Sequence, residues 1–123
     1  MYRAILVLGL WACSVASYGG APVCTAIYCS YTGQVNQAYV NEYNQVILYY
    51  DTMLTPQQSS LMNTTHPDGC VVDLSTAAGA QFGKMFYATL LTAQATRRAV
   101  TVFIFPATST GLFPRCDRIW LAQ

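Results

Sequence analysis

Few side chains in this sequence have the types and spacing that catalysis requires. His66 is the only histidine, and Asp68 follows it closely enough to orient its ring as in a catalytic triad. Ser59 and Ser60 lie nearby, but neither occupies the strand–turn–helix setting that exposes a nucleophilic serine. A histidine in a loop containing Pro and Gly is usually only exposed to solvent, and we interpret His66 in that way.

Two acidic residues could form a second catalytic arrangement. Asp51 and Asp73 are candidates for the carboxylate pair of a glycosidase. Each stands near the expected end of a strand or helix, where a carboxylate more often acts as a solvated cap. The sequence also contains no Gly-rich phosphate-binding loop and no Cys/His spacing typical of a metal site. We therefore expect no catalytic residue, no metal and no cofactor.

The first residues follow the pattern of a secretory leader. Arg3 precedes an uncharged apolar run over residues 4–12, and small residues follow that run. The run is shorter than the about 20 residues that span a bilayer. We predict a signal peptide at residues 1–17 and a single domain at residues 18–123, located outside the cell or in the periplasm. Leu10 to Cys13 partly resembles a lipoprotein box, so a protein anchored through lipidated Cys13 is an alternative.

Four cysteines follow the leader, and an even number in an exported chain predicts disulfides. Three pairings are open, and we favour Cys70 with Cys116 and Cys24 with Cys29. On the chain-entropy description the longer loop contributes about 4 kcal/mol and the shorter about 2 kcal/mol. All four thiols are then used, which leaves no thiol nucleophile after the leader.

The charge balance excludes two classes of partner. The whole chain carries a formal net charge of +1, and removal of Arg3 with the leader brings it to zero. No basic stripe could neutralise phosphates, so we expect no nucleic-acid partner. The mature chain also lacks a polybasic patch for anionic lipid, and we expect no transmembrane segment in it.

Hydrophobic patterning predicts five strands and one helix. Strands are expected at residues 28–40, 45–50, 70–72, 100–105 and 117–121, and a turn at 41–44 joins the first two into a hairpin. Residues 54–69 and 106–114 are loops by composition. A helix should begin after Ser75 or Thr76 and run to about Thr96, with two arginines at its negative end. This order predicts an α+β, mostly β domain: a five-stranded OB-like barrel, or a strongly curved open sheet, with one helix between strands 3 and 4.

The predicted helix is apolar on one face and unusually uncharged on the other. The sheet-facing arc consists of Phe82, Phe86, Leu90 and Ala93. The opposite side is a small, weakly polar stripe made of Gln81, Lys84, Ala88, Thr92 and Ala95. The stripe fits a partly covered helix in a monomer or a helix beside copies of itself. We favour the homo-oligomer because small residues allow close approach.

Tyrosine and asparagine are concentrated in the first hairpin. Such residues combine stiff apolar surfaces with hydrogen-bonding groups, which suits sugars and exposed protein surfaces. The alternative is that these tyrosines fill and cover the sheet, since strands favour tyrosine. The candidate binding residues are Tyr31, Tyr39, Asn41, Tyr43 and Asn44.

Residues 86–102 resemble a segment of small secreted bacterial proteins of unknown function, in which an Ala/Leu-rich helix leads through a short basic turn into a Val-rich strand. Cys70 before the helix, Cys116 before the last strand and the segment Tyr31 to Val35 fit the same group. More distantly, the layout is similar to the receptor-binding B subunits of AB-type toxins of the subtilase-cytotoxin and pertussis-like group. Those subunits are disulfide-bonded OB folds that form pentameric rings and bind glycans.

The resemblance implies an exported, non-enzymatic glycan-binding module, a pentameric homo-oligomer and a catalytic toxin subunit as partner. No glycan-binding residue of that group can be matched to a position here. A second hypothesis, from a different class, is a monomeric periplasmic or envelope protein that inhibits or scaffolds another protein.

Overall fold

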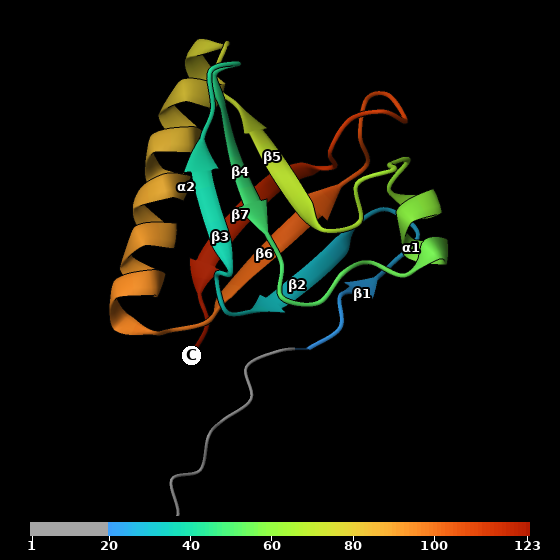
Figure 1. Cartoon of the computed structure of the whole chain (residues 1–123), viewed down its shortest axis with the longest axis horizontal. Coiled ribbons are helices and arrows are strands. Elements are labelled where there is room, and N and C mark those ends of the chain that lie inside the picture. The colour runs from blue at the N-terminus through green and yellow to red at the C-terminus, as the bar shows by residue number, and fades with distance from the viewer. Residues whose placement is uncertain (1–19) are drawn as a thin grey trace, which may run out of the picture.

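The computed structural model describes residues 20–123, so the predicted leader and Cys13 lie outside the described residues. This part of the chain forms seven strands and two helices (Figure 1). In chain order they are β1 (Val23–Cys24), β2 (Cys29–Gly33), β3 (Gln37–Val40), β4 (Gln45–Tyr49), α1 (Pro56–Leu61), β5 (Gly69–Asp73), α2 (Ala77–Thr96), β6 (Val100–Phe105) and β7 (Arg115–Leu121). Helix α2 lies along one side of the sheet, and α1 lies at the far end from it.

All seven strands belong to one sheet with the order β1-β2-β6-β7-β5-β4-β3. Neighbours are antiparallel except β5 and β7, which are parallel where Val71 meets Arg115. Strands β2 and β3 lie far apart in this order, although only residues 34–36 connect them. Such a connection spans at most about 14 Å. The sheet must therefore curl strongly to bring β3 back towards β2.

The predicted α+β, mostly β class is confirmed, but the five-stranded barrel is wrong, because the sheet has seven strands and is not closed. The segment predicted as one strand over residues 28–40 is divided into β2 and β3. The hydroxyl of Tyr31 lies 2.8 Å from the carbonyl oxygen of Gln34, at the point where β2 ends. Beyond it β3 pairs with β4, whereas β2 pairs with β6. The predicted hairpin therefore contains β3 and β4 only.

Helix α1 occupies a segment that composition predicted to be a loop. Thr55 caps it: its hydroxyl accepts a hydrogen bond from the Gln58 amide, and the Gln58 side chain accepts one from the Thr55 amide. Pro56 sits in the first turn, where its missing N–H is not needed. This capping box satisfies two unpaired backbone donors and starts a helix despite the Pro and Ser content.

Helix α2 follows the sequence prediction closely. The Thr76 hydroxyl caps it by accepting from the Gly79 amide, and the helix ends at Thr96. Arg97 then adopts a left-handed conformation with φ of 53°, which terminates the helix before β6. Phe86, Leu90 and Ala93 are buried on the predicted face.

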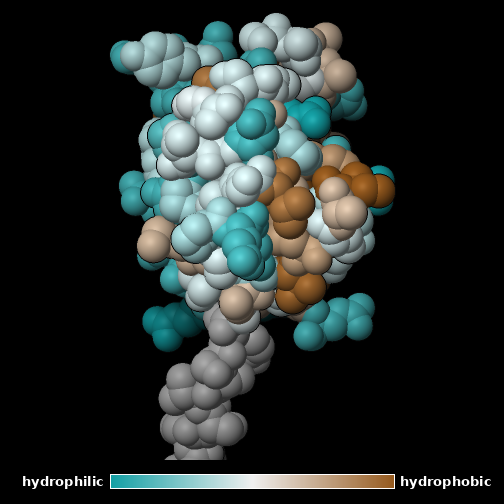
Figure 2. Space-filling model, turned by 90° about the vertical axis from the view of Figure 1, so that its right-hand side faces the viewer, coloured by the Kyte–Doolittle hydropathy of each residue, from teal (hydrophilic) through white to brown (hydrophobic). Residues whose placement is uncertain are grey.

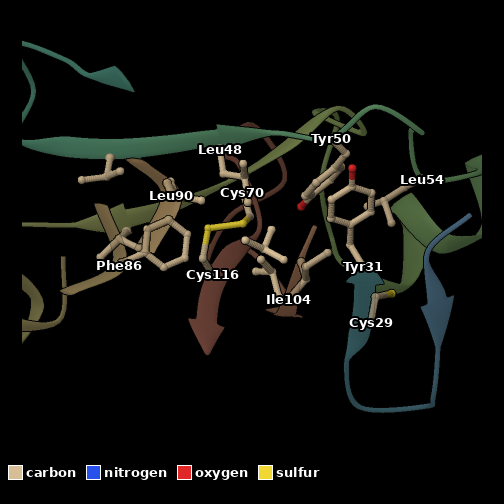
Figure 3. Close-up of a cluster of buried hydrophobic side chains, with 14 of the residues drawn as sticks. Cys29, Tyr31, Leu48, Tyr50, Leu54, Cys70, Phe86, Leu90, Ile104 and Cys116 are labelled. Carbon is tan, nitrogen blue, oxygen red and sulfur yellow. A yellow bond between two sulfur atoms is a disulfide. The ribbon is translucent and has the colours of Figure 1, made fainter. Parts of the chain in front are cut away.

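The core lies between α2 and the curved sheet (Figure 3). Phe86 and Leu90 lie at one end of this core and Ile104 lies near its middle. At the other end Tyr31 packs on Tyr50 with ring centroids 4.9 Å apart. The Cys70–Cys116 disulfide crosses this core between β5 and β7, and the Cys24–Cys29 disulfide joins β1 to β2. Both predicted pairings are confirmed.

The end of the molecule that carries α1 and β1 shows a strip of hydrophobic side chains on a mostly hydrophilic or neutral face (Figure 2). The exposed large apolar residues of these segments are Val23, Ile27, Met53 and Leu61. Among residues 20–123, neither helix is long and apolar enough to cross a bilayer.

Candidate functional site

Four rings make a connected row on the side of the sheet that faces away from the core. Tyr39 of β3 stacks with Tyr49 of β4 at a centroid distance of 6.0 Å, and Tyr49 meets the edge of Phe113 at 5.9 Å. Phe113 in turn stacks on His66 at 4.2 Å with an interplanar angle of 15°. All four are half-buried. We call these four rings the aromatic row.

The period of two along the strands places the tyrosines of this row. Leu48 and Tyr50 flank Tyr49 and are buried in the core, so Tyr49 itself must point to the opposite face. Tyr39 lies opposite Ile47 in the β3–β4 ladder and shares that outer face. The hydroxyls of Tyr39 and Tyr49 are 3.4 Å apart, and this hydrogen bond raises the pKa of Tyr49 to about 12.

A hollow of about 340 Å³ adjoins the aromatic row. His66 and Phe113 form its aromatic wall. The remaining lining comes from β4, β5, β7 and the loop before β7, namely Gln45, Val71, Asp73, Thr108, Gly111, Leu112 and Arg115. The hollow therefore joins ring surfaces to hydrogen-bonding groups of both signs of charge.

The charged groups of the hollow remain able to bind a ligand. Arg115 donates through Nε to the Pro106 carbonyl at 3.1 Å. It forms no salt bridge within residues 20–123, where the one such pair is Arg118 with Asp117. Asp73 accepts a hydrogen bond from the Ser75 amide, which lowers its pKa and keeps it ionised at neutral pH.

The loop over residues 106–114, which forms one wall of the hollow, is held by residues 62–66. The Thr65 amide donates to the Thr110 carbonyl at 3.0 Å, and the Asn63 side-chain amide donates to the Ala107 carbonyl at 3.2 Å. Thr64 is the buried polar residue of the described chain, and its hydroxyl donates to the Leu112 carbonyl at 2.6 Å. The wall of the hollow is thus positioned by a segment far away in the sequence.

His66 also takes part in the contacts between residues 62–66 and the loop over residues 106–114. Its Nε2 lies 3.1 Å from the Gly111 carbonyl, and its backbone amide donates to the Thr64 hydroxyl. No hydrogen bond joins His66 to Asp68 among the residues described, so the pair is not arranged as in a triad. The interpretation of His66 as merely exposed is wrong, because the ring is half-buried against Phe113.

The two carboxylates considered as a glycosidase pair lie at opposite ends of the sheet. Asp73 lies opposite Gln45 at the start of β4, whereas Asp51 follows the end of β4 six residues later. At strand spacing this separates their backbones by roughly 20 Å, well beyond the span of a glycosidase pair. Asp51 accepts a hydrogen bond from the buried Tyr31 hydroxyl instead.

The five predicted binding residues do not form one site. Tyr39 lies in the aromatic row, and Tyr43 is 73% exposed at the tip of the hairpin. Asn41 holds that tip, since its side-chain oxygen accepts from the amides of Tyr43 and Gln45. Asn44 also serves the turn, with a left-handed φ of 57°.

Tyr31 cannot contact a ligand at the surface, so its assignment to a binding site is wrong. Its side chain is completely buried in the core (Figure 3). Burial, and then the hydrogen bond to Asp51, raise the pKa of Tyr31 well above its ordinary value.

The predicted oligomer-facing stripe is exposed along α2. All five of its residues are solvent-exposed, and the Thr92 hydroxyl donates to the Ala88 carbonyl one turn earlier. This hydroxyl is thus satisfied by the helix itself, so the stripe offers fewer free polar groups than its composition indicates. Packing of α2 beside other copies stays a prediction.

Sequence reasoning missed most of the hollow. Gln45, Phe113 and Arg115 were not candidates, and each stands in a segment with no recognisable motif. They meet because β5 pairs with both β4 and β7, a long-range event that local patterns do not reveal. Tyr49 stands in a continuous apolar run over residues 46–50, which predicts a strand but does not show which of its residues face outward.

No protein-family model, no curated protein and no solved structure matches this chain. Its function is therefore inferred from the aromatic row and the hollow.

Proposed function

We propose that this protein is an exported, non-enzymatic binding module that holds a glycan in the hollow beside the aromatic row. The observation that carries the proposal is that the stacked His66 and Phe113 rings line a hollow of about 340 Å³ together with polar side chains, among them Gln45, Asp73 and Arg115. A sugar ring has apolar C–H faces and a rim of hydroxyls. It can stack on the rings while its hydroxyls bond to the polar residues.

Asp73, Arg115 and Gln45 each have a distinct part in this proposal. Ionised Asp73 accepts hydrogen bonds from sugar hydroxyls, and the terminal nitrogens of Arg115 donate to sugar oxygens. Gln45 offers both a donor and an acceptor. The hydrogen bonds from residues 62–66 hold the aromatic wall in place before a ligand arrives, which reduces the ordering that binding requires.

The strand order supports an OB-like interpretation of the curved sheet. If β2 and β3 are counted as two parts of one bent strand, β4 and β5 are the second and third strands, and residues 106–114 connect the fourth to the fifth. OB folds use these strands and this loop to bind oligosaccharides and oligonucleotides. The hollow lies there, and the absence of a basic stripe in the sequence favours the sugar.

The location proposed is outside the cytoplasm. Two disulfides join strands of the sheet, and such bonds persist in oxidising compartments. They are compatible with export.

A glycan array followed by calorimetry on the oxidised mature protein tests the proposal. For a glycan that binds, Phe113→Ala is expected to weaken affinity at least tenfold, which corresponds to about 1.4 kcal/mol. Trp120→Ala, an exposed aromatic residue that does not line the hollow, is the matched control and should leave affinity unchanged. No binding on the array, or equal losses for the two variants, would reject the glycan site.

A further inference from the structure

Strand β3 forms an edge of the sheet, and its outer side is unpaired in the described chain. β3 pairs only with β4. The Asn41 amide donates to the Gln45 carbonyl at 3.0 Å, so this position is a hydrogen-bonded pair. Bonded pairs alternate along an antiparallel ladder, so Tyr39 bonds to β4 while Ala38 and Val40 direct their N–H and C=O groups outward.

This edge lacks two of the features that usually prevent strand addition. Natural edges are often protected by charged residues or proline. β3 reads Gln-Ala-Tyr-Val and contains neither charge nor proline. The opposite edge strand, β1, is only two residues long.

An apolar groove of about 170 Å³ runs beside this edge, between α2 and the β3–β4 hairpin. Val40 and Val46 line it from the hairpin, and Leu74, Ala80, Gly83 and Tyr87 line it from α2 and the segment before that helix. Val40 is 51% exposed, so its side chain is accessible where the groove meets the edge. Lys84 is the one charged residue of the lining.

We propose that β3 receives an extended segment of another protein, which adds to the sheet as an eighth strand. The outward backbone groups of Ala38 and Val40 specify a strand as the occupant. One apolar side chain of that strand enters the groove, and an acidic residue beside it pairs with Lys84. Self-pairing of two copies through β3 fits less well, because each copy would bring its Lys84 and neither groove offers an acidic residue.

This surface is separate from the hollow and gives the scaffold hypothesis a specific contact. Gln45 lines the hollow and Val46 lines the groove, and successive residues of a strand point to opposite faces. The proposal therefore does not depend on glycan binding.

The test uses nuclear magnetic resonance titration of the oxidised protein with a capped six-residue peptide of alternating threonine and valine that carries one glutamate. The expected result is shifts centred on the amides of Ala38 and Val40. A peptide methylated on the backbone nitrogens that face β3 is the matched control and should cause none. Shifts centred elsewhere, or equal effects of both peptides, overturn the proposal.

Two variants separate the backbone contact from the charge contact. Val40→Pro removes an outward N–H without removing a bond to β4 and should weaken binding at least tenfold. Lys84 lies on an exposed face of α2. Lys84→Glu should therefore reverse the preference for charge, so that a lysine peptide binds better than the glutamate peptide. If Lys84→Glu still prefers the glutamate peptide, the predicted ion pair with Lys84 is contradicted. If light scattering shows a dimer that Val40→Pro abolishes, the edge binds a second copy of this chain instead.

Discussion

Thr64 is predicted to hold the wall of the hollow, and Thr64→Val isolates that role. The substitution preserves the shape of the side chain and removes its hydroxyl. The lost hydroxyl donates to the Leu112 carbonyl at 2.6 Å and accepts from the His66 amide at 2.9 Å, in a residue that is only 6% exposed. Two net hydrogen bonds at about 1 kcal/mol each give an expected loss of about 2 kcal/mol in the free energy of unfolding.

Urea unfolding of the oxidised protein measures the global effect, and amide hydrogen exchange measures the local one. The Thr65 amide, which bonds to the Thr110 carbonyl at 3.0 Å, reports whether residues 62–66 stay attached to the loop. If the full 2 kcal/mol is felt there, exchange of this amide accelerates by about 30-fold. Thr65→Val is the matched control, because its hydroxyl makes only a long, exposed bond of 3.3 Å to the Thr110 carbonyl and should contribute less than about 0.5 kcal/mol.

Equal stability losses for Thr64→Val and Thr65→Val would refute this reasoning. So would a destabilised Thr64→Val protein whose Thr65 amide exchanges at the unchanged rate, since the loss would then lie outside the loop contact. Weaker glycan binding in Thr64→Val than in Thr65→Val would further connect the segment to the hollow.

Three other perturbations have defined outcomes. A Cβ at Gly79 would lie 2.0 Å from the Asp73 carbonyl oxygen, so Gly79→Ala should lower stability in urea by about 2 kcal/mol, whereas Gly111→Ala, with no atom within 4 Å, should not. Replacing both half-cystines of the β5–β7 disulfide with alanine frees a separation of 46 residues and should lower stability by about 4 kcal/mol in the same titration. The raised pKa of Tyr49 predicts a stabilising contribution that is complete below pH 10 and lost as the pH rises through about 12, which urea unfolding as a function of pH measures.

Elements with complete local signals could be predicted from the sequence. β6 alternates buried and half-buried residues over its whole length, and its bounds match the expected strand. α2 begins at a threonine cap and carries a continuous apolar face. The capping box of α1 was also present in the sequence as Thr55 and Gln58. The helix was missed because Pro56 and two serines predicted a loop.

Choices between distant partners could not be predicted. The segment over residues 28–40 has one continuous strand-like composition, and only the availability of β6 for one half and β4 for the other divides it. The candidate site depends on the same kind of choice. Phe113 and Arg115 reach the hollow through the parallel contact of β5 with β7 and through the hydrogen bonds from residues 62–66.

Strand β4 separates the two proposed sites and makes their tests independent. Gln45 lines the glycan hollow, whereas Val46 lines the groove beside α2. A ligand in one site therefore does not overlap a ligand in the other. Val40→Pro should leave glycan affinity unchanged, and Phe113→Ala should leave the peptide shifts at β3 unchanged. If each variant impaired both ligands, a general loss of sheet structure would explain the results better than two separate surfaces.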